Sequence, residues 1–108
     1  MATQGIVSVM KRGRVVMKFI TGADGMKAKI LAAAILKLGE IPSIDKAYTL
    51  ARRLKFGGKE SLVVMTETEV KFCGDDELSE LYRKTFKKPR FNPRWEHGTA
   101  DHVEIIEL

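Results

Sequence analysis

The sequence predicts a single α+β domain over residues 1–108, in which helices pack on one face of a mostly antiparallel sheet. Three observations predict this class. Short runs rich in Val, Ile and Met lie between turn residues, as strands do. Segments with apolar residues at helical spacing alternate with pairs of these runs, and no repeat or interdomain linker divides the chain. The expected order of elements is ββααββαβ, and hairpins joined through helices favour antiparallel pairing.

The first element is a β-hairpin formed by residues Gly5–Met10 and Val15–Thr21. The intervening Lys11–Arg14 contains a glycine, which a tight reversal with positive φ requires. The second strand alternates an apolar set with a mixed set, namely Val15, Met17 and Phe19 against Val16, Lys18 and Ile20. We expect the apolar set to face the core and the mixed set to be partly solvated. A helix or a second subunit of a homodimer would cover the mixed set.

Two helices follow the hairpin. The first is expected from about Met26 to Leu38, with Asp24 as N-cap, and its apolar residues on most sides predict a largely buried helix. The second begins after Ser43, whose hydroxyl is a favoured cap, and ends at Gly57-Gly58. Its predicted buried face consists of Ile44, Ala47, Tyr48, Ala51 and Leu54, and its solvated face of Asp45, Thr49, Arg52 and Arg53.

The second half of the chain predicts two more strands, a helix and a last strand. The runs Leu62–Met65 and Val70–Cys73 flank Thr66–Glu69, which is either a hairpin turn or the exposed middle of one long strand; we favour the hairpin. Asp75 or Asp76 caps a third helix that ends near Phe86. His102–Leu108 then returns the chain to the sheet.

The composition indicates a cytoplasmic protein without a membrane span. Cys73 is the one cysteine and has no intramolecular partner for a disulfide, and the first four residues lack the pattern of a secretory signal. The longest apolar run, Ile30–Leu36, is much shorter than the roughly 20 residues that cross a bilayer.

Charge is segregated along the chain, although the net charge is only +5. Residues 1–59 hold twelve bases and three acids, residues 60–82 one base and seven acids, and residues 83–94 six bases and no acid. The remaining residues hold four acids. These blocks would either pair with each other in the fold or leave a basic face for an anionic partner.

The segment from Arg83 to Trp95 is the main candidate for binding an anionic partner. It interleaves cations with rings, namely Arg83, Lys84, Lys87, Lys88, Arg90 and Arg94 with Phe86, Phe91 and Trp95. Cations neutralise phosphates or carboxylates, and rings stack on bases. In the competing interpretation the cations solvate a helix end and a loop, while Phe91 and Trp95 anchor that loop to the core.

Two weaker candidates lie elsewhere. Helix amides, glycines and lysines near the strand-to-helix junction would attract an anion; the residues are Gly22, Gly25, Lys27 and Lys29. The carboxylate of Asp24 would compete for those amides, so we favour a plain helix cap. His97, Asp101 and His102 would be metal ligands, but their spacing matches no established motif and a solvated loop is the better interpretation. We expect neither a cofactor nor catalysis.

The hairpin, the Asp24-Gly25 loop with its following helix, and the acidic strand from Ala100 to Ile105 resemble small uncharacterised domains of phages and bacteria. The resemblance implies an accessory protein of a mobile element and carries over no activity or functional residue.

The expected function is therefore that of a small non-catalytic binding or accessory protein, which presents a basic face to an acidic protein partner. We build that face from the first hairpin and the segment from Arg83 to Arg94. Nucleic-acid binding through residues 83–95 is the second hypothesis. A nucleotide- or metal-binding protein, or an enzyme, is the third.

Overall fold

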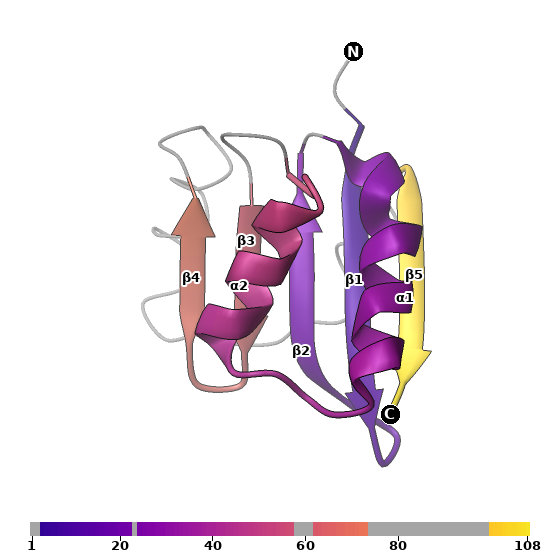
Figure 1. The fold of residues 1–108 in the computed structure, drawn as a ribbon, viewed down its shortest axis with the longest axis vertical. Coiled ribbons are helices and arrows are strands. Elements are labelled where there is room, and N and C mark those ends of the chain that lie inside the picture. The colour runs from indigo at the N-terminus through magenta and orange to yellow at the C-terminus, as the bar shows by residue number, and fades with distance from the viewer. Residues whose placement is uncertain (1–2, 23, 58–61, 74–99) are drawn as a thin grey trace.

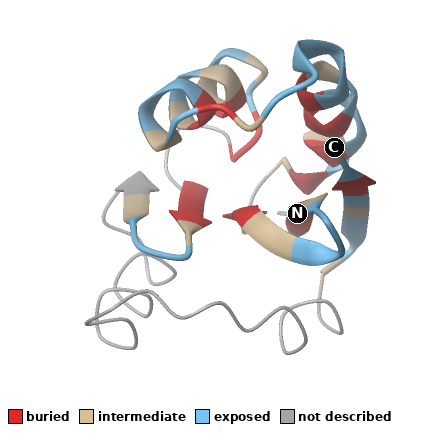
Figure 2. Cartoon of the chain, turned by 90° about the horizontal axis from the view of Figure 1, so that it is seen from below, coloured by how far each residue is buried: buried red, intermediate tan, exposed pale blue. Residues whose placement is uncertain are grey.

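The computed structural model describes residues 3–22, 24–57, 62–73 and 100–108. Five described strands form one sheet in the order β4-β3-β2-β1-β5, and both described α-helices lie on the same face of it (Figures 1 and 2). The α+β class is thus confirmed. The third helix, expected from Asp75 to Phe86, lies outside the described residues.

The first hairpin is confirmed. Strand β1 (Gly5–Lys11) pairs antiparallel with β2 (Arg14–Thr21). The two turn residues Arg12 and Gly13 have φ values of 54° and 78°, the left-handed geometry that matches the twist of a two-residue hairpin. One extra residue in β2 makes a bulge, because Val9 pairs with Met17 while Met10 pairs with Val15.

The second pair of strands is a hairpin rather than one long strand. Strand β3 (Leu62–Thr66) pairs antiparallel with β4 (Val70–Cys73). The Thr66 hydroxyl oxygen accepts hydrogen bonds from the backbone N–H groups of Thr68 and Glu69, at 3.3 and 3.1 Å. The Thr66 N–H donates to the Glu69 carbonyl at 2.9 Å, which closes the turn.

The last strand returns to the sheet, but the sheet is mixed. Strand β5 (His102–Glu107) pairs with β1 in parallel, so the expectation of a mostly antiparallel sheet holds only for the other described pairings. The pairing is anchored at both ends. The His102 N–H donates to the Gln4 carbonyl at 3.1 Å, and the Leu108 N–H donates to the Met10 carbonyl at 2.9 Å.

The main core lies between the sheet and the helices. A 3-10 turn, η1 (Gly25–Lys27), leads into α1 (Ala28–Leu38), and α2 (Ile44–Arg53) follows. Small and branched side chains of the helices cover the apolar side of β1, β2 and β3; the fully buried members include Leu31, Ile35, Ala47, Ala51, Val7, Val9, Met17, Phe19 and Val64. Alanines on α2 let its backbone lie close to the strands.

The outer side of α1 corrects the expectation of a largely buried helix. Ile30 is 50% exposed and Leu36 is 49% exposed, whereas Leu31 and Ile35 are fully buried. Burial therefore follows one face of the helix, because one sheet can cover only one side of a straight helix. Apolar composition alone overestimated how many neighbours α1 has.

The second face of the sheet corrects another expectation. Lys18 and Ile20 were expected to be partly solvated, yet they are 0% and 5% exposed and lie beside buried Ile6, Val63 and Met65. Lys18 has an interaction partner. A buried charge without one would cost a large free energy of desolvation.

The entry to α1 differs from the predicted cap. Asp24 has a left-handed backbone, with φ of 55°, and its side chain makes no cap hydrogen bond. The Gly25 N–H instead donates to the Thr3 carbonyl at 3.0 Å, which draws this backbone against the start of β1. A Cβ at Gly5 would lie 2.6 Å from the Gly25 Cα, and a Cβ at Gly25 would meet the Gln4 carbonyl. Glycine is required at both positions.

The Gly25→Ala substitution is expected to lower the free energy of unfolding by about 3 kcal/mol, because two backbone segments would have to separate. Gly39→Ala is the matched control, since Gly39 has φ of 72° with open space around it. The control is expected to cost only about 1 kcal/mol, from the left-handed backbone. Urea denaturation of both variants measures the difference; equal losses would contradict the close contact.

Adjacent α1 residues provide a second test. Leu31→Ala is expected to cost about 3 kcal/mol because it leaves a cavity in the core, whereas Ile30→Ala is expected to cost about 0.5 kcal/mol or less. Thermal unfolding of the two variants beside the parent chain measures the contrast. A loss on Ile30→Ala as large as that on Leu31→Ala would mean that the outer side of α1 is covered.

The N-terminus of α2 provides a third test. The Ser43 hydroxyl accepts a hydrogen bond from the Lys46 N–H at 3.3 Å, as the sequence predicts. Ser43→Ala is expected to lower stability by about 1 kcal/mol, because that amide loses its acceptor. Thr49→Ala, on the exposed side of the same helix, is the control and should change stability by less. Equal effects in chemical denaturation would show that the cap does not stabilise α2.

Candidate functional site

The main segment predicted to bind an anionic partner lies outside the described residues. This holds for all its members, namely Arg83, Lys84, Lys87, Lys88, Arg90, Phe91, Arg94 and Trp95. It also holds for His97 and for the side chain of Cys73. The role of the segment therefore stays a prediction.

The predicted anion site at the start of the first helix is described. The Gly25 N–H donates to the Thr3 carbonyl at 3.0 Å, and the Lys27 N–H donates to the Asp24 carbonyl at 3.1 Å. Lys29 is exposed and Lys27 is half-buried, while Gly22 is engaged in an interaction of its own. Two amides that an anion would need are already bonded to carbonyls. Anion binding here stays a prediction.

The predicted metal ligands are described only in part. The Asp101 carboxylate accepts a hydrogen bond from the Gln4 N–H at 2.9 Å, and His102 is exposed at the start of β5. Within the described ranges, no group of three or more His, Cys, Asp or Glu side chains is placed to hold a metal ion. The structure gives Asp101 a local role, in fixing the chain where β5 begins beside β1.

Two described ion pairs join segments that are distant in the sequence. Arg14, in the first hairpin, pairs with Glu67 in the β3–β4 turn. Asp45, at the start of α2, pairs with Lys71 of β4 at 2.6 Å, and the Lys71 ammonium lies 4.7 Å from the centre of the Tyr48 ring. Of these two, only the Arg14–Glu67 pair joins a base of residues 1–59 to an acid of residues 60–82, as predicted. In the Asp45–Lys71 pair the signs are reversed, because Asp45 is an acid of the basic block and Lys71 the base of the acidic block.

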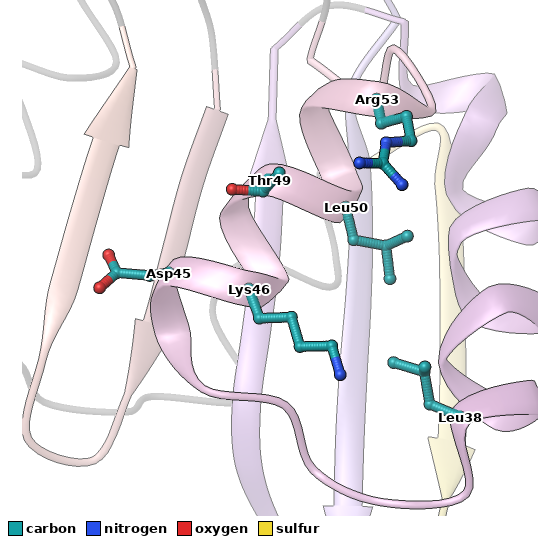
Figure 3. A pocket seen from close by; sticks show the side chains of 6 residues that line it. All are labelled: Leu38, Asp45, Lys46, Thr49, Leu50 and Arg53. Atoms are coloured by element: carbon teal, nitrogen blue, oxygen red, sulfur yellow. The ribbon is translucent and has the colours of Figure 1, made fainter.

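The site that the structure adds is a cleft of about 430 Å³ between the end of α1 and the outer side of α2 (Figure 3). Its lining residues combine apolar, cationic and polar side chains; they are Leu38, Asp45, Lys46, Thr49, Leu50 and Arg53. We call it the interhelix cleft. It is open to solvent and its lining comes from both helices.

Within the interhelix cleft, Lys46, Leu50 and Arg53 form one stripe of α2. They stand at positions i, i+4 and i+7, which share one side of a helix. Figure 3 shows their side chains extending into the gap toward α1, where Leu38 lies, whereas Asp45 points the other way, toward β4. The carboxylate of Asp45 is held there by its ion pair with Lys71.

The two cations of the stripe, Lys46 and Arg53, are exposed. Among the residues that the structure describes, neither side chain has an ion-pair or hydrogen-bond partner. Each cation stands about one turn from half-buried Leu50, so the cleft offers an apolar centre between two positive charges.

Sequence reasoning placed Arg53 on a solvated face and did not identify this cleft. One signal was present in the pattern, because Lys46, Leu50 and Arg53 put a leucine between two cations on one helical stripe. The opposite wall of the cleft is formed by Leu38 of α1, and no periodicity in the sequence relates Leu38 to the residues of α2.

Comparison of the chain with protein-family models, with curated proteins and with solved structures finds no match. Of the described helices, neither combines the length and the apolar character that crossing a membrane would demand.

Proposed function

We propose that this chain is a small non-catalytic binding protein that presents cations to an acidic surface on a protein partner. The observation that carries the proposal is the pair Lys46 and Arg53, exposed beside Leu50 and without ion-pair partners among the described residues. Cations that remain unpaired keep their charge for an incoming anionic surface, and they favour its approach and orientation.

The net positive charge of the helical layer as a whole also supports the proposal. Between residues 24 and 57 the chain carries seven bases and three acids; the bases are Lys27, Lys29, Lys37, Lys46, Arg52, Arg53 and Lys55, and the acids are Asp24, Glu40 and Asp45. The ion pair with Lys71 already neutralises Asp45. An acidic partner would therefore meet a positive potential on the side of the sheet that bears the helices.

The described surface favours a protein partner over single-stranded nucleic acid. Base recognition of that kind uses exposed rings as stacking platforms. Among the described aromatic side chains, Phe19 and Phe56 are fully buried, and half-buried Tyr48 has Lys71 over its ring. The cations of the helical layer thus lack free rings in the described part of the chain, whereas a protein partner needs only carboxylates and apolar side chains.

The test is affinity capture of partners by the full chain from a nuclease-treated lysate. We expect one or more acidic proteins to be retained and to dissociate as salt is raised, because exposed charges are screened. The Lys46→Gln/Arg53→Gln double variant is expected to bind the purified partner about tenfold more weakly. Lys37→Gln/Lys55→Gln, which removes the same charge from exposed positions outside the interhelix cleft, should retain most of the affinity.

Two results would overturn the proposal. Capture that disappears after nuclease treatment would identify nucleic acid as the partner. Equal binding by the parent chain and by the Lys46→Gln/Arg53→Gln variant would show that these cations are not used. Circular dichroism and thermal unfolding of both double variants confirm that each remains folded, as expected for exposed side chains.

A further inference from the structure

The apolar part of the interhelix cleft continues along α1. Leu38 lines the cleft and is 38% exposed. Ala34 and Ile30 precede it by one and two turns on the same stripe, at i, i+4 and i+8, and Ile30 is 50% exposed. An elongated apolar strip on α1 therefore leads into the cleft that Leu50 borders on α2.

The cations of α2 are spaced for two separate anionic groups. Lys46 and Arg53 are seven residues apart, which is about 10 Å along a helix axis. A single carboxylate or phosphate is bound tightly when its donors converge on it. Two cations separated by two turns, with Leu50 between them, instead match two carboxylates that flank an apolar group.

A helix supplies that pattern most simply. Residues i and i+7 of a second helix, laid along α2, repeat the same interval of about 10 Å, and residues i+3 and i+4 lie between them on the same side. An extended peptide is recognised by strand addition at a sheet edge or, in the polyproline II form, by an aromatic-lined groove. None of the described lining residues of the cleft is aromatic. Both walls of the interhelix cleft are helices, whose interior N–H and C=O groups are already bonded to each other.

We infer that the interhelix cleft is the docking site for an acidic amphipathic helix, with carboxylates at i and i+7 and apolar residues at i+3 and i+4. The inference rests on the proposed function and adds the structure of the partner segment. The carboxylates would meet Lys46 and Arg53, and the apolar residues would cover Leu50 and Leu38. This is the helix-in-groove mode of recognition, with charge setting the register.

The test uses two labelled, alanine-based helical peptides of identical composition. The first carries Glu at i and i+7 with Leu at i+3 and i+4; the second keeps the leucines and moves both Glu residues to the opposite side of the helix. We expect the full chain to bind the first peptide about tenfold more tightly, by fluorescence anisotropy, because only the first aligns both carboxylates with the cations.

Variants of the chain test whether the first peptide binds in the interhelix cleft. Lys46→Gln/Arg53→Gln is expected to abolish the preference between the peptides, and Leu50→Gln to weaken binding of the first peptide about tenfold through the lost apolar contact. Lys37→Gln/Lys55→Gln, outside the cleft lining, should keep the preference. Amide chemical shifts of the labelled chain should change in α2 from Lys46 to Arg53 and near Leu38, which gives a readout independent of affinity.

Failure of this inference is separable from failure of the proposed function. Equal binding of both peptides, or shift changes away from the interhelix cleft, would overturn helix docking, while an acidic protein still captured through Lys46 and Arg53 would leave the proposed function standing. Tighter binding of an oligothymidine strand than of the first peptide would overturn both. Preferential binding of the first peptide with loss on Lys46→Gln/Arg53→Gln supports both.

Discussion

The arrangement of the helices depends on one close contact between two backbone segments. The chain leaves β2, passes against the start of β1 at Gly25 and Gly5, and enters α1 there, with the Gly25 N–H bonded to the Thr3 carbonyl. A side chain at either glycine would push these segments apart. Because α1 begins at this point and runs over β1 and β5, the contact also determines where Leu38 lies, and hence where α2 faces α1 (Figure 1).

Local features of the fold could be predicted from the sequence because local residues determine them. The Arg12-Gly13 turn needs positive φ at two neighbouring positions, and Ser43 caps the helix that directly follows it. The features that could not be predicted are long-range. Parallel pairing of β5 with β1 and the complete burial of Lys18 depend on which distant segments meet, and neither leaves a periodic signal in the sequence.

The candidate site could be predicted only in part, for the same reason. Charge segregation suggested that basic and acidic blocks would either pair or remain separate, and the described residues show some pairing, as between Arg14 and Glu67. Which cations remain unpaired depends on geometry. Asp45 stands next to Lys46 in the sequence, yet it points toward Lys71 on β4, so it does not neutralise its neighbour in the interhelix cleft.

In the proposed function, Lys46 and Arg53 would affect the selectivity of binding as well as the attraction of a partner. An exposed apolar strip such as Ile30 and Leu38 carries a risk of association with a second copy of the chain. Two copies joined face to face through the interhelix cleft would bring Lys46 and Arg53 of each toward cations of the other, and like charges at an interface cost free energy. An acidic helix would meet no such repulsion. On the proposed function, the placement of Lys46 and Arg53 around Leu50 would therefore favour an acidic partner over a second copy of the chain, through the same side chains.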